Sequence, residues 1–192
     1  SIPAGIGAAI LADGVRGTLA VIVFAFGTTL MLGVSALVHL RDWPIERVEL
    51  LIRLDHSAIF VMYATSATPI ALMALEERQA TIVLAFAYVG ALGGVVVEFL
   101  PFHPPRGLVN TVYITFGLSF LLFIPWMLEG LTSAQFAILL IGGMFYAGGS
   151  IIVGAQWPDP WTDTFGYHEI WHVFVVIGAG LHYWLALQLV VA

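Results

Sequence analysis

Long apolar segments separated by short polar connections make up most of this chain of 192 residues. A helix needs about 20 mostly apolar residues to cross a bilayer. Six segments reach that length, and they cover residues 17–40, 51–75, 80–100, 107–128, 132–155 and 168–192. The shorter apolar stretch 2–12 has the character of the second half of one more helix. The pattern predicts an all-α, polytopic membrane bundle of seven helices, the first of them partial.

The connections are short and contain helix breakers, so we expect residues 1–192 to form one transmembrane domain. Residues 42–54 alternate charged with apolar side chains, and Pro44 suits the first turn of a helix. We expect this segment to lie along the membrane interface and to turn into the bilayer at Asp55. Because no methionine stands at position 1, we also expect the amino terminus to be trimmed.

Composition indicates a membrane protein, and it argues against nucleic acid as a partner and rules out cysteine as a metal ligand. Hydrophobic residues make up 60% of the chain and charged residues 9%, against roughly 25% charged in a soluble domain. The net charge is −6 and lysine is absent, which argues against nucleic acid as a partner. With no cysteine, any bound metal must use His, Asp or Glu as ligands. We expect a multi-pass protein of the cell membrane.

Arginines set the expected orientation. The loops after the second, fourth and sixth helices, counting the partial one, hold four of them, and the opposite loops hold two; they are Arg41, Arg47, Arg53 and Arg106 against Arg16 and Arg78. Since positive charge favours the cytoplasmic side, this bias places the amino terminus inside and the carboxyl terminus outside.

Polar residues gather at one end of three predicted helices. Ser35 and His39 close the second helix, Asp55 opens the third, and His168 and His172 open the seventh. Because successive spans alternate in direction, these ends lie at the same membrane face. Ionisable groups within a bilayer are costly and normally mark function.

This set of residues has the chemistry of a zinc site. His168 and His172 are four residues apart, so they share one helix face, and His39 offers a third nitrogen from another helix. Three histidines with an open fourth position form a common catalytic zinc set. Asp55 is then a candidate general base and acid, and Ser35, one turn from His39, a candidate hydrogen-bond donor to a ligand or substrate carbonyl.

Other interpretations stay open for several of these residues. The two histidines of the last helix can equally form a buried hydrogen-bonded pair. The run 168–172 also matches H-E-x-x-H, in which Glu169 would be the base instead of Asp55. We expect His182 to be a core or headgroup residue, His56 to have a packing or interface role, and Glu98 to be an interfacial carboxylate.

The quoted residues resemble a known family, the hemolysin III and adiponectin-receptor (progestin and adipoQ receptor) family. The resemblance rests on motifs in the family's order, namely SALVH at 35–39, LDHS at 54–57, YAGG at 146–149, HEIWH at 168–172 and HY at 182–183. It covers nearly the whole chain from about Gly17, and the short loops favour the bacterial hemolysin III branch. The resemblance implies a seven-helix bundle with the amino terminus inside, zinc on His39, His168 and His172, and Asp55 orienting the zinc water.

The resemblance also implies candidate activities. Eukaryotic relatives are similar to alkaline ceramidases, and bacterial relatives are linked to membrane-fluidity homeostasis. We therefore expect a zinc-dependent hydrolase of a lipid amide such as ceramide, with membrane lipids as partners. A second hypothesis is a receptor or sensor in which zinc only staples two helices. A pore-forming haemolysin ranks last, because no charged ring or continuous polar stripe is present for a wide channel.

Overall fold

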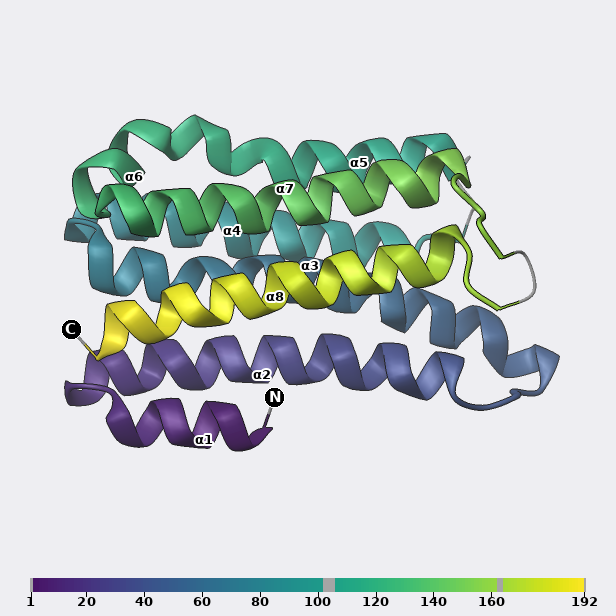
Figure 1. Ribbon diagram of the computed structural model, residues 1–192, viewed down its shortest axis with the longest axis horizontal. Coiled ribbons are helices and arrows are strands. Elements are labelled where there is room, and N and C mark those ends of the chain that lie inside the picture. The colour runs from purple at the N-terminus through teal and green to yellow at the C-terminus, as the bar shows by residue number, and fades with distance from the viewer. Residues whose placement is uncertain (1, 102–105, 162–163, 192) are drawn as a thin grey trace. The chain divides into compact units, whose positions relative to one another are not determined.

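The computed structural model describes residues 2–101, 106–161 and 164–191, and nearly all of this part of the chain is helical (Figure 1). The helices are α1 (Ile2–Leu11), α2 (Gly14–His39), α3 (Ile45–Ala74), α4 (Glu77–Glu98), α5 (Arg106–Leu118), the 3-10 helix η1 (Ser119–Phe123), α6 (Ile124–Gly130), α7 (Ser133–Ala155) and α8 (Tyr167–Val190). Contacts divide the chain into two compact units, and each is described by itself.

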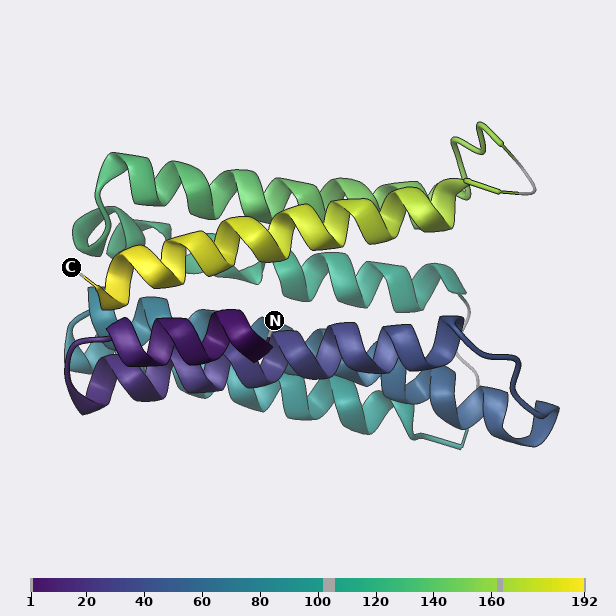
Figure 2. The same cartoon turned by 60° about the horizontal axis from the view of Figure 1, so that its bottom comes forward.

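The first unit comprises residues 1–101 and 186–192. In it α2 packs against α3 and α3 against α4, and these three helices run side by side in Figure 1. The short α1 packs along the first part of α2 (Figure 2). Close approach of α2 and α3 depends on Gly27, because a methyl group there would overlap the side chain of Thr65.

The second unit comprises residues 102–185. It holds α5, η1 and α6, which follow one another in the chain, together with α7 and most of α8. α7 begins with a capping box in which Thr132 and Gln135 satisfy each other's backbone N–H groups at 3.0 and 3.3 Å. α7 packs against α5, and glycines of α7 lie against aromatic rings of α8.

The membrane prediction is confirmed by length and composition. Within the described residues, six helical segments are long and apolar enough to cross a bilayer, and α1 is a shorter apolar helix. The fifth predicted span is not one regular α-helix, because it passes through η1 before Pro125 enters the first turn of α6. The orientation in the membrane and the single domain stay predictions.

One expectation about the third helix is wrong. The segment before Asp55 does not form a separate interfacial helix that turns at that residue, since α3 runs without a break from Ile45. The physical reason lies in side-chain contacts of this early part of α3, where Arg53 bonds to the end of α4 and to Glu49 one turn earlier.

Candidate metal centre

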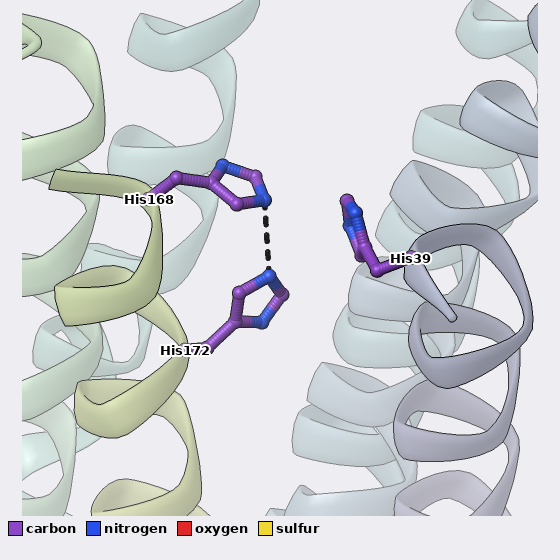
Figure 3. A group of neighbouring side chains, drawn as sticks. All are labelled: His39, His168 and His172. Atoms are coloured by element: carbon purple, nitrogen blue, oxygen red, sulfur yellow. Dashed lines mark hydrogen bonds between the residues drawn. The ribbon is translucent and has the colours of Figure 1, made fainter. Parts of the chain in front are cut away.

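His168 and His172 face each other in the first turns of α8. Their Nε2 atoms are 3.0 Å apart, and their rings stand at 80° to each other (Figure 3). Both side chains are half-buried. The four-residue spacing on one helix face therefore brings two imidazole nitrogens together, as the sequence predicted.

The distance between these nitrogens suits two kinds of interaction. It fits an N–H···N hydrogen bond between one donor and one acceptor ring. It also approximates the edge of a tetrahedral zinc site, since two nitrogens each about 2.0–2.1 Å from zinc lie roughly 3.3 Å apart. Two imidazole nitrogens at this separation fit zinc, which is commonly bound by imidazole.

The side chain of Glu169 caps the start of α8. Its carboxylate accepts a hydrogen bond of 2.8 Å from the backbone N–H of Gly166. Such a contact satisfies one of the N–H groups that a helix leaves without a partner at its amino end. Glu169 is also exposed. These contacts are those of a helix cap, so they favour Asp55 over Glu169 as the general base.

His39 and Asp55 come together in the first unit. His39 is the last residue of α2, and its Nε2 lies 3.9 Å from Oδ2 of Asp55 on α3. The side chains are 40% and 21% exposed, respectively. This separation is too long for a good direct hydrogen bond, so the two groups lie near each other as a long-range polar pair. Ser35 lies one turn before His39 and is half-buried.

The end of α2 is fixed by an aromatic side chain. Trp43 donates its indole N–H to the backbone carbonyl of Leu37 at 2.9 Å. That carbonyl belongs to the last turn of α2, where carbonyls lack partners in the helix. The guanidinium carbon of Arg41 lies 4.9 Å from the centre of the Trp43 ring. These contacts position the turn that carries His39, and the sequence pattern did not reveal them.

The structure thus forms two parts of the predicted centre, the histidine pair of α8 and the pair of His39 with Asp55. The prediction that all of them bind one zinc ion stays a prediction. His182 lies apart from the pair, at the α7–α8 contact, where its Nε2 donates to the Leu139 carbonyl at 3.2 Å. Its ring is also 5.4 Å from that of Tyr146, which agrees with the expected core role.

Sequence comparison identifies relatives over most of the chain. The model of a family described as Haemolysin-III related matches residues 6–183, which include every residue of the candidate centre. Hemolysin-3 of Bacillus cereus is 30% identical over 154 residues, which cover 80% of this chain and 67% of that protein. The Hemolysin-3 homolog of Bacillus subtilis is 29% identical over 134 residues, which cover 70% of this chain and 60% of that protein.

Plant proteins are similar as well. The heptahelical transmembrane protein ADIPOR2 of Oryza sativa subsp. japonica is 29% identical over 178 residues, covering 84% of this chain and 77% of that protein. The bacterial and plant relatives together place the chain within the wider family that the sequence motifs resemble.

Proposed function

The chain belongs to the haemolysin-III-related family of multi-pass membrane proteins, and from this premise we propose that it binds zinc and hydrolyses a lipid amide. The ligands are His39, His168 and His172. The substrate class is an N-acylated lipid such as ceramide, and the activity serves membrane-lipid homeostasis. The proposal needs no partner other than membrane lipids.

The observation that supports the proposal most is the 3.0 Å separation of the two Nε2 atoms in α8. A third ligand is needed for an open catalytic zinc site. His39 is the candidate because four candidate spans lie in the chain between the end of α2 and the start of α8. An even number of crossings returns the chain to the membrane face that it left. Each of the three residues offers one imidazole nitrogen.

The residues of the centre divide the work of amide hydrolysis. Bound zinc would supply Lewis acidity, polarising a carbonyl and making water acidic enough to act near neutral pH. Asp55 accepts the proton of the attacking water at its carboxylate and passes it to the amide nitrogen as the C–N bond breaks. The products are a fatty acid and a lipid amine. Ser35 is placed one turn from His39 to donate a hydrogen bond to the substrate carbonyl.

Zinc content and product release, measured on the same purified protein, test the proposal. We expect one zinc ion per chain and release of free fatty acid from ceramide in detergent or nanodiscs. Zinc without product would support a receptor or sensor in which the ion staples two helices. Liposome leakage that does not depend on metal would support a pore. Protein that binds no zinc after reconstitution contradicts the proposal.

A further inference from the structure

We propose that Arg53, His56 and Glu98 form a positioning clamp between α3 and α4 that holds Asp55 toward α2. Their role as positioning residues for the reaction rests on the proposed function, because it takes Asp55 as the general base. Their effect on the geometry of Asp55 does not depend on it.

Arg53 binds the end of α4 through the backbone. Its Nη1 donates to the carbonyl of Glu98 at 2.5 Å and to that of Leu100 at 3.1 Å. Carbonyls at the carboxyl end of a helix have no partner within the helix, so the guanidinium satisfies that of Glu98, the last residue of α4, and also binds the segment just after the helix at Leu100. Nη2 and Nε donate to Glu49 at 2.7 and 3.2 Å, which fixes the guanidinium from its other side.

His56 binds the same turn of α4 through a side chain. Its Nδ1 lies 3.3 Å from Oε2 of Glu98, whose side chain is only 12% exposed. A carboxylate so far withdrawn from water needs hydrogen-bond partners. The last turn of α4 is therefore held at both its backbone and its one charged side chain by residues of α3.

These contacts determine which way Asp55 points. Residues on a helix are 100° apart, so Arg53 and His56 lie about 60° apart on one face, and Asp55 lies about 100° from His56. α3 packs against α4 and also against α2. With Arg53 and His56 bound to α4, Asp55 is directed to the side of α2, where Oδ2 lies 3.9 Å from Nε2 of His39.

The forked shape of arginine explains why this residue serves at position 53. Two backbone carbonyls and a carboxylate require several N–H donors in a fixed plane, which guanidinium supplies and the compact ammonium group of lysine does not. The clamp also joins residues far apart in the chain. The connection between α3 and α4, from Ala74 to Glu77, lies at the other ends of these two helices, away from the clamp.

Cysteine cross-linking measures the clamp directly, because the chain has no cysteine of its own. Cysteines replace His39 and Asp55, and the rate of bridging by a short bifunctional thiol reagent is measured in detergent. In this background, Arg53→Met combined with His56→Phe should lower the rate about tenfold, the scale of losing hydrogen bonds to charged groups. Arg53→Lys should give an intermediate rate.

A second cysteine pair on the same two helices separates positioning from general stability. Thr28 and Met62 are in contact, with Oγ1 and Sδ 3.4 Å apart, deeper along α2 and α3. Bridging of cysteines at these positions should not change in the clamp variants. The exposed Arg78 is the matched control, and Arg78→Met should change neither rate. An unchanged rate for the 39/55 pair, or an equal fall for both pairs, overturns the clamp.

The same clamp variants with native His39 and Asp55 connect the inference to the reaction. Zinc content should stay near one ion per chain, because none of the clamp residues is a proposed zinc ligand. Release of fatty acid should fall. If the wild type binds no zinc or releases no product, the proposed function fails, and the cross-linking rates still decide whether the clamp exists.

Discussion

Replacement of Asp55 by Asn removes a proton acceptor while keeping the size and one acceptor oxygen of the side chain. In the structure Oδ2 of Asp55 lies 3.9 Å from Nε2 of His39. That distance is too long for a direct hydrogen bond, and in the proposed function Asp55 would act on a water at the metal rather than bind the metal itself. The substitution should therefore affect proton transfer more than metal binding.

The expected loss is large. A positioned general base contributes about 10²–10⁴-fold in rate, and we expect Asp55→Asn to lower the rate of fatty-acid release by that range. Zinc content should stay near one per chain, because three histidines suffice for an open zinc site.

Glu169→Gln is the matched control. Its amide oxygen can still accept the hydrogen bond that the Glu169 carboxylate now accepts from Gly166, so the cap of α8 is kept. We expect this variant to retain most of the activity.

Fatty-acid release from labelled ceramide and elemental analysis, run on the same preparations, decide between the possibilities. Loss of zinc in Asp55→Asn would make Asp55 a direct ligand. Full activity in Asp55→Asn together with an inactive Glu169→Gln would refute the reasoning and make Glu169 the base.

Four further predictions concern the zinc ligands, the effect of zinc on stability, the packing of α7 on α8 and the orientation. His172→Ala should lose most of the zinc in elemental analysis, whereas His182→Ala, outside the centre, should keep it; equal retention would remove His172 from the site. Chelation of zinc should lower the melting temperature in detergent, since a ligand bound only by the folded protein stabilises it; an unchanged melting curve after verified zinc loss would contradict this. Gly142→Ala should destabilise the protein by about 1–3 kcal/mol, because the new Cβ would lie 2.5 Å from the ring of His182, whereas Gly143→Ala meets nothing nearer than 3.6 Å; equal melting temperatures would exclude this contact. A reporter fused to the carboxyl terminus should be active only outside the cytoplasm, and cytoplasmic activity would reverse the orientation.

The sequence predicted the spans because their signal is strong and local. Some 20 apolar residues in succession identify a membrane helix without knowledge of its neighbours. The histidine pair of α8 was predictable for a similar reason, since a spacing of four residues on one helix fixes which side chains meet. Both the spans and the histidine pair could be predicted because each depends only on residues close together in the chain.

The clamp and the cap of α2 were not predictable in this way. Arg53 meets the carbonyl of Glu98 across 45 residues of sequence, and the bond uses the backbone, which carries no residue-specific signal. Trp43 likewise donates to a backbone carbonyl. The early start of α3 follows from such contacts, so the pattern of charged and apolar residues placed the start of this span six positions too late, at residue 51 instead of Ile45.

In both parts of the candidate centre, a packing residue next to a reactive residue sets the direction of the reactive side chain. In α3, His56 binds α4, and its neighbour Asp55 is thereby turned toward α2. In α8, Trp171 packs on α7 at Gly149, where a Cβ would lie 2.6 Å from its ring. Since adjacent residues differ by 100° around a helix, this contact directs His172, with His168 one turn before it, to a different face. In each case a packing residue next to the reactive residue sets the rotation of its helix. That packing side chain lies against a glycine or a helix end of the neighbouring helix. The sequence shows the reactive residues, but only the packing between helices shows which adjacent residue orients each of them.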